Sequence, residues 1–124
     1  MKNAVLKRHF LAPGGMKQIT DPAFQSLCKS DTCADVVRMS ITLDAEGIIS
    51  DIGTEVYGCG YSIAGSSLFN ETAKGANISL VEDLWKKKLS SVIDDVPDSN
   101  KTCVNLPYKA FKLIYDKYSS NGKE

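Results

Sequence analysis

Net charge is the first property that this chain of 124 residues lacks. Its fifteen basic and fifteen acidic side chains cancel, so the long-range attraction to phosphate on which nucleic-acid binding depends is missing. The one basic run, residues 86–88, falls inside a helix-like segment and is interpreted as a solvated helix face. We therefore expect no nucleic-acid partner.

Long apolar runs are also absent. No stretch of the chain reaches the length of a membrane span, and residues 1–8 become charged too early for a signal peptide. We therefore expect a cytoplasmic protein with no membrane partner. Thiols are kept reduced in that compartment, so the four cysteines indicate metal or sulfur chemistry more than disulfides.

Internal repeats, low-complexity tracts and linkers are absent as well. With 43% hydrophobic and 24% charged residues, the composition is that of an ordinary globular protein, and the length is typical of one domain. We expect a single domain over residues 1–124 whose last residues, 118–124, fray.

Hydrophobic periodicity predicts a small α+β fold. Residues 37–43 alternate apolar and polar side chains, as in a half-buried strand, and residues 48–57 return as its antiparallel partner after a turn. Residues 19–31 are predicted to be loop with at most one edge strand. Helices are predicted over residues 3–10 and 62–74, from Ser79 onward and from Pro107 onward.

The expected core joins the sheet to the last two helices. We expect an antiparallel sheet of two or three strands with helices packed on one face. Ser79 and Glu82 stand at capping-box spacing, which predicts that Leu80 is buried just inside the helix. The sheet residues Val37, Met39 and Ile41 should meet the helix residues Leu84, Leu113 and Ile114.

Three of the four cysteines precede an expected element, Cys33 a strand and Cys59 and Cys103 helices. Such positions can converge at one exposed end of a small fold, and a helix N-terminus lowers a thiol's pKa because its dipole favours the thiolate. Asp35 projects to the same side of an extended chain as Cys33. Three thiolates and one carboxylate make a tetrahedral set that favours zinc or an iron-sulfur cluster over calcium or magnesium.

The alternative is that these cysteines are small buried hydrophobic residues. Their spacing matches no zinc-finger pattern, so spacing alone does not decide between the two interpretations. Glycine on both sides of Cys59 favours a site, because a backbone without side chains lets a ligand or partner approach.

Several short motifs, in their order and spacing, resemble the IscU/NifU-type iron-sulfur cluster assembly scaffolds. The likeness extends from about Val5 to Tyr118, and the family's Cys-Gly-Asp, Gly-Cys and third-cysteine motifs correspond to residues 33–35, residues 58–59 and Cys103. Further shared segments are Asp44-Ala45-Glu46-Gly47-Ile48-Ile49, Tyr57-Gly58-Cys59-Gly60, Ser66-Ser67 and Lys74-Gly75.

The resemblance implies a SufE/NifU-like fold and a cluster assembly scaffold rather than an enzyme. It implies that Cys33, Asp35, Cys59 and Cys103 hold a transient [2Fe-2S] cluster and that Cys103 accepts sulfur. It further implies a cysteine desulfurase, an iron donor and recipient apo-proteins as partners. The alternative within the family is a zinc-bound, SufU-like sulfur acceptor that stimulates a desulfurase.

The sequence departs from the family pattern at three places. Ala34 replaces the glycine of the first motif, and Thr102 stands where the IscU branch has a ligand histidine. Only Pro97 remains of the Leu-Pro-Pro-Val-Lys segment that IscU proteins offer to an Hsp70-type chaperone, which argues against that partner. SufU proteins also lack the histidine, but they carry an insertion for which this chain is too short.

The remaining chemical groups have simpler interpretations. Cys28 is expected to be a bystander thiol, and His9 a surface or partly packed residue. Trp85 should pack in the core, whereas Tyr57 is a candidate to shield the site. The candidates to offset the negative charge of a thiolate cluster are Lys101 and Lys112.

Overall fold

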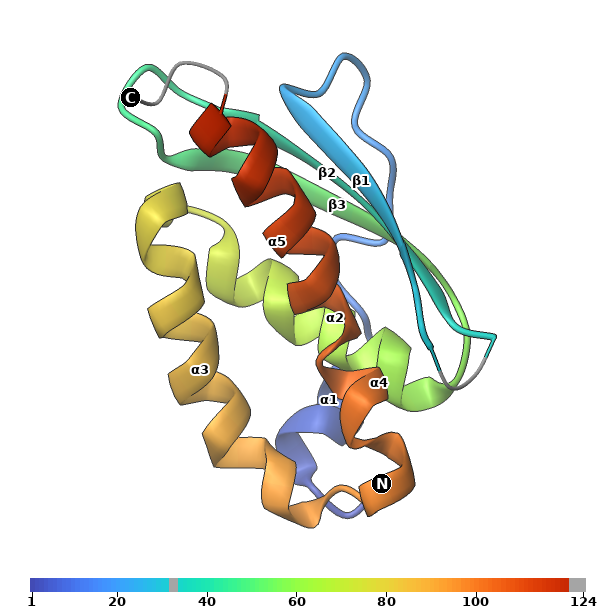
Figure 1. Ribbon diagram of the computed structural model, residues 1–124. Coiled ribbons are helices and arrows are strands. Elements are labelled where there is room, and N and C mark those ends of the chain that lie inside the picture. The colour runs from blue at the N-terminus through green and yellow to red at the C-terminus, as the bar shows by residue number, and fades with distance from the viewer. Residues whose placement is uncertain (32–33, 121–124) are drawn as a thin grey trace.

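The computed structural model describes residues 1–31 and 34–120 (Figure 1). One helix precedes three consecutive strands, the remaining helices follow them, and single-turn 3-10 helices cover residues 78–80, 93–95 and 98–100. The longer elements are α1 (Ala4–Leu11), β1 (Phe24–Lys29), β2 (Val36–Leu43), β3 (Ile49–Tyr57), α2 (Gly60–Ala73), α3 (Val81–Val92), α4 (Lys101–Val104) and α5 (Leu106–Tyr118).

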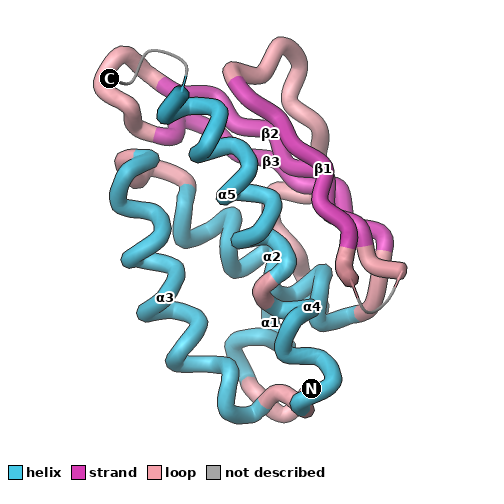
Figure 2. Tube along the Cα trace, in the orientation of Figure 1, coloured by secondary structure: helices cyan, strands magenta, loops and turns pink. Residues whose placement is uncertain are grey.

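The strands form one antiparallel sheet in the order β1-β2-β3. The helices lie on one face of this sheet (Figure 2). Helix α5 packs on β1 and β2 and α2 packs on β3, while α1, α3 and α4 pack against α2. The predicted α+β class, with a three-stranded antiparallel sheet and helices on one face, is confirmed. None of the helices in the described ranges has the length and apolar character needed to cross a membrane.

The central strand β2 forms as its alternation predicts. Val37, Met39 and Ile41 are fully buried under the helices, and Arg38 between them is exposed. The turn to β3 is fixed by the Asp44 carboxylate, which accepts the backbone N–H groups of residues 46 and 48. Glycine suits position 47 of this turn because its φ is +84°.

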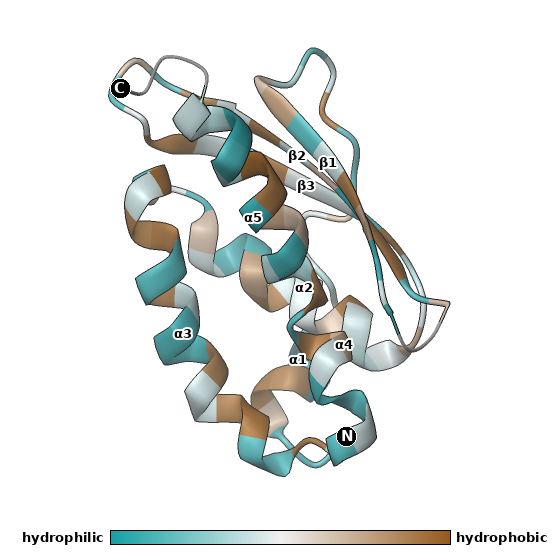
Figure 3. Ribbon diagram, in the orientation of Figure 1, coloured by the Kyte–Doolittle hydropathy of each residue, from teal (hydrophilic) through white to brown (hydrophobic). Residues whose placement is uncertain are grey.

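Large side chains from three helices fill the core. Phe69 of α2 contacts Trp85 of α3 and Phe111 of α5, with ring centroids 5.0 and 5.5 Å apart. In Figure 3 hydrophobic stretches alternate with hydrophilic ones along α3, the pattern of a helix with one buried side. At the C-terminal end of α5, Tyr118 packs edge-to-face on Phe24 of β1.

Three residues that were predicted to be buried are exposed. Leu84 and Leu113 are 39% and 43% exposed, and Leu80 is 54% exposed. The predicted capping box is wrong as well, because Asn77 accepts the N–H of Ser79 and starts a 3-10 turn there. The α-helix therefore begins only at Val81. Trp85 and Ile114 are buried as predicted, and Phe111 is a further buried residue.

Candidate metal centre

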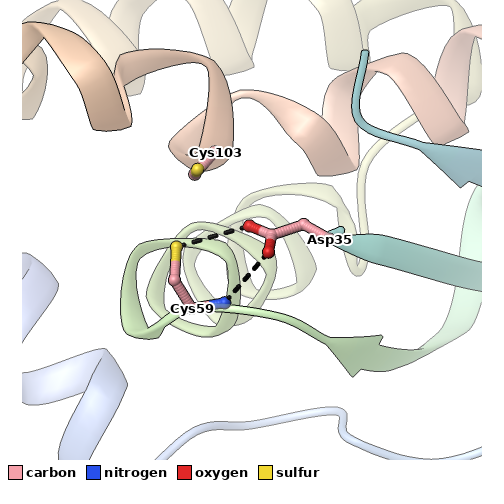
Figure 4. Close-up of side chains that lie close together, drawn as sticks. All are labelled: Asp35, Cys59 and Cys103. Atoms are coloured by element: carbon pink, nitrogen blue, oxygen red, sulfur yellow. Dashed lines mark hydrogen bonds between the residues drawn. The ribbon is translucent and has the colours of Figure 1, made fainter. Parts of the chain in front are cut away.

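Three of the four predicted ligands converge at one end of the sheet. One ligand atom each from Asp35, Cys59 and Cys103 lies within 4.8 Å of the other two (Figure 4). Asp35 comes just before β2, Cys59 lies between β3 and α2, and Cys103 belongs to α4. Cys33, the fourth predicted ligand, lies outside the described residues.

Asp35 links the strand end to the first turn of α2. Its side chain is buried, and its Oδ1 accepts the backbone N–H of Cys59 at 3.2 Å. Its Oδ2 accepts the Cys59 thiol at 3.3 Å and a short hydrogen bond from the hydroxyl of Ser62. Cys59 occupies the N-cap position of α2, and its own side chain makes no capping hydrogen bond. Asp35, which lies outside the helix, instead accepts the backbone N–H of Cys59 in this first turn.

These hydrogen bonds keep Asp35 ionised. Burial alone would raise the pKa of its carboxyl group, but the bonds from Ser62, Cys59 and Cys103 outweigh burial and hold the pKa below its usual value. At neutral pH the site therefore contains a fixed negative charge and an oxygen ligand that faces the sulfur atoms.

The two glycines beside Cys59 have different neighbours. A side chain at Gly58 would overlap the carboxyl group of Asp35, so glycine here makes room for a predicted ligand. A Cβ at Gly60 would lie 3.0 Å from the Phe10 ring and 3.3 Å from the methyl group of Met1. The interpretation of these glycines as free space for an incoming molecule was wrong, because residues of the chain itself fill it.

Cys103 reaches the site because α4 lies directly against α2. A Cβ at Gly65 of α2 would overlap the backbone carbonyl of Val104, so only glycine permits this approach. Cys103 is 3% exposed, and its sulfur lies within 4.8 Å of ligand atoms of Asp35 and Cys59. Its burial therefore depends on a backbone contact between segments far apart in the sequence.

The pKa of the Cys103 thiol differs from the prediction. Burial, followed by its contacts with Cys59 and Asp35, raises its pKa to about 12, whereas the sequence predicted a pKa lowered by a helix N-terminus. The helix that holds it, α4, has only four residues, so its dipole offers little compensation. Cys103 is consequently a protonated thiol at neutral pH in the metal-free protein.

The predicted charge-neutralising and shielding residues do not serve the site in this way. The Lys101 ammonium donates to the carbonyls of Ile93 and Val96 at 2.8 and 2.9 Å, so it fastens the preceding loop. Lys112 faces Asp116 on the same helix, at 4.0 Å. Tyr57 is 66% exposed, so its ring is mostly in solvent rather than packed over the site.

His9 is fully packed rather than a surface residue. It is 4% exposed, its Nδ1 lies 2.7 Å from the Ser67 Oγ, and its Nε2 lies 2.9 Å from the Glu71 carboxylate. Burial lowers the pKa of the imidazole, although the neighbouring Glu71 opposes this shift. His9 therefore ties α1 to α2, which is a structural role.

One residue of the site was missed and one cysteine stays apart. Ser62, which is completely buried and bonded to Asp35, has no distinguishing signal in the sequence except its place three residues after Cys59. Among the described residues the metal-ligating group has three members, and Cys28 is not one of them. Cys28 is half-buried in β1, and burial raises its pKa.

The donor set suits a soft or borderline metal ion. Two sulfur atoms and one carboxylate oxygen are ligands that zinc and iron accept, whereas calcium and magnesium prefer oxygen alone. The residues also fit the pattern of a site whose ligands are held by hydrogen bonds before any ion arrives. The arrangement can therefore hold a metal ion.

The chain is similar to known proteins over most of its length. The chain is 30% identical over 110 residues to the iron-sulfur cluster assembly scaffold protein IscU of Buchnera aphidicola subsp. Baizongia pistaciae, which covers 89% of this chain and 86% of the relative. It is 27% identical over 111 residues to the protein of the same name from Aquifex aeolicus, covering 89% and 71%.

Two solved structures share the fold. An N-terminal NifU-like protein structure from Brucella abortus superposes with a TM-score of 0.78 at 14% identity, covering 95% of this chain and 94% of that one. A SUF-system scaffold, FiSufU from Fervidobacterium islandicum, gives 0.74 at 16% identity, covering 90% and 93%. The model of the family described as "NifU-like N terminal domain" matches residues 1–124. The chain belongs to this NifU-like N-terminal domain family.

Proposed function

We propose that this protein is a cytoplasmic scaffold on which an iron-sulfur cluster is assembled and from which it is passed on. Its cargo would be a [2Fe-2S] cluster held by Cys33, Cys59 and Cys103 with Asp35. The observation that carries the proposal is the convergence of Asp35, Cys59 and Cys103 from three separate parts of the chain. The names of the IscU relatives support the same assignment.

Sulfur would enter through Cys103, with a cysteine desulfurase as donor. The Cys103 thiolate attacks the terminal sulfur of the donor's persulfide, a new S–S bond forms, and the donor cysteine leaves as a thiolate. Because burial raises the pKa of Cys103 to about 12, this step requires that the thiol first lose its proton. Docking of the donor and entry of a metal ion are the events that would promote this loss.

The ligand set would favour release of the cluster over its long-term storage. Thiolates bind iron firmly, whereas the single carboxylate is a harder and weaker ligand whose oxygens already accept hydrogen bonds. The chain supplies ligands and geometry rather than catalysis. Iron would come from a separate donor, and the finished cluster would go to recipient apo-proteins. We expect no Hsp70-type chaperone among these partners, since only Pro97 of its recognition segment is present.

A zinc-bound sulfur acceptor that stimulates a desulfurase is the second candidate. It is favoured by Thr102, which is exposed and replaces the histidine of the IscU branch. Three cysteines and one aspartate would then give zinc a closed, four-ligand site. Elemental analysis of protein isolated without oxygen separates the candidates, because stoichiometric zinc in a colourless protein favours the acceptor and iron with sulfide favours the scaffold.

Reconstitution is the direct test of the scaffold. Purified protein supplied anaerobically with iron and sulfide should develop the visible charge-transfer absorption of a [2Fe-2S] centre. Cys103→Ser should lose this absorption, whereas Cys28→Ser, which removes a thiol outside the described metal-ligating group, should keep it. A colourless wild-type product, or equal absorption from the Cys103 variant, would contradict the proposal.

A further inference from the structure

Ser62 is a buried polar residue that contacts two of the predicted metal ligands but is not a predicted ligand itself. It is 0% exposed, at the third position of α2, and its hydroxyl donates the short hydrogen bond to Asp35 Oδ2. The same hydroxyl lies 3.8 Å from the Cys59 sulfur. Ser62 therefore lies beside both an oxygen and a sulfur of the candidate metal centre.

The two oxygens of Asp35 have different neighbours. Each carboxylate oxygen has two lone pairs, and those of Oδ2 face the Ser62 hydroxyl and the Cys59 sulfur. A metal ion held between Asp35 and Cys59 would use the lone pair on the sulfur side. The bond from Ser62 lies on the other side of Oδ2, so it is compatible with metal binding there.

Two hydrogen-bond donors fix the direction of the Asp35 carboxylate. The backbone N–H of Cys59 donates to Oδ1, and the Ser62 hydroxyl donates to Oδ2. Ser62 is therefore the donor on the oxygen that lies 3.3 Å from the Cys59 sulfur.

We propose that Ser62 is a positioning residue that holds Asp35 Oδ2 toward the sulfur atoms, so that the carboxylate can serve as a metal ligand. The inference rests on the proposed metal-binding function and adds a residue to it. It assigns Ser62 an effect on metal affinity that passes through Asp35.

Titration with Co²⁺ under anaerobic conditions tests this role, because the absorption bands of the ion report the ligands around it. Ser62→Ala should weaken Co²⁺ binding about 10–100-fold, the usual effect of removing a hydrogen bond to a metal ligand. Its Co²⁺ spectrum should shift toward that of Asp35→Ala. Ser62→Thr, which keeps the hydroxyl, should bind Co²⁺ more tightly than Ser62→Ala.

Ser66→Ala is the matched control. Ser66 is one helical turn further along α2 and is also 0% exposed, and its Oγ lacks a hydrogen-bond partner within the described chain. Its loss removes a buried hydroxyl of the same helix and should leave Co²⁺ affinity unchanged. Thermal melting of each metal-free variant shows whether it is folded before metal is added.

A double-mutant cycle decides how Ser62 acts. If its effect passes through Asp35, then Ser62→Ala should cause no further loss of affinity when Asp35 is already alanine. An equal loss in both backgrounds, or a wild-type affinity for folded Ser62→Ala beside a weakened Asp35→Ala, would overturn the inference and leave the metal site in place. Failure of the wild-type protein to bind Co²⁺ would overturn the proposed function as well.

Discussion

Helix α2 is held by two polar clusters that differ in their hydrogen-bond donors. At its N-terminal turn, Asp35 accepts bonds from Cys59 and Ser62. In its second half, His9 bridges Ser67 and Glu71. Both clusters are buried at their centres and both fasten α2 to a distant part of the chain.

The difference lies in the donors. The N-terminal cluster includes the Cys59 thiol as a donor, and in the proposed function a metal ion would replace this hydrogen bond. The second cluster is closed by an imidazole and by the backbone N–H of Gly14, which donates to Ser67, and none of its residues belongs to the metal-ligating group found in the described chain. In the proposed function the first cluster would exchange a hydrogen bond for metal ligation, whereas the second would keep its bonds.

Gly58→Ala should produce the largest effect and should break the N-terminal cluster alone. The added methyl group would overlap the Asp35 carboxyl group, so we expect Co²⁺ affinity to fall about 100-fold and stability to fall by about 1–3 kcal/mol. Gly14→Ala is the control, because a Cβ there meets nothing within 4 Å. Equal behaviour of the two variants would mean that Asp35 does not depend on this close approach.

His9→Ala should break the second cluster and spare the first. Removing the imidazole takes away the partner of Glu71 and one of the two partners of Ser67, which keeps the N–H of Gly14, and the free energy of unfolding should fall by about 1–3 kcal/mol. Co²⁺ affinity should stay at the wild-type value, measured by the same titration. A parallel loss of affinity would show that the two clusters are coupled through α2.

Acid should act on the His9 cluster. The pKa of His9 is lowered in the folded protein below its ordinary value of 6.5, so the unfolded chain binds the proton more strongly. Its contribution to stability is complete above pH 6.5 and is lost as the pH falls through the folded pKa. Denaturant unfolding between pH 7 and 5 should show this loss in the wild type and less of it in His9→Ala.

Alkali should act on the metal-free N-terminal cluster. The pKa of Cys103 is raised from 9.0 to about 12, so the unfolded chain gives up the thiol proton first. The stabilisation is complete below pH 9 and is lost as the pH rises toward 12. Wild type should therefore lose more stability than Cys103→Ser over this range, and an identical pH dependence would contradict the buried, protonated thiol.

The parts of the fold that could be predicted are those governed by local periodicity. Val37, Met39 and Ile41 alternate with polar residues and are buried as expected, since a strand permits only two faces. The predicted burial of Leu84 and Leu113 was wrong because side chains point in all directions around a helix, so the buried side is harder to predict. The 3-10 turn at residues 78–80 also shifts the residue at which α3 begins. Tertiary packing adds Phe111 to the predicted core residue Trp85.

The candidate site also has a part that could be predicted from the sequence and a part that could not. The resemblance and the element ends pointed to Asp35, Cys59 and Cys103, which do converge. The surroundings of Cys103 were not predictable, because its burial depends on the contact of α2 with α4, and this contact depends on packing between distant segments. Ser62 was missed because nothing in the local pattern distinguishes it from the other serines of α2.

The glycine at position 65 has a consequence for how the sequence can vary. Since backbone meets backbone where α2 crosses α4, the distance between these helices does not depend on the volume of any side chain at the crossing. We therefore expect that neighbouring apolar residues can be replaced by larger or smaller ones while the distance between the Cys103 and Cys59 sulfur atoms is kept. The residues of the interior can therefore vary in sequence while the ligand residues keep their positions.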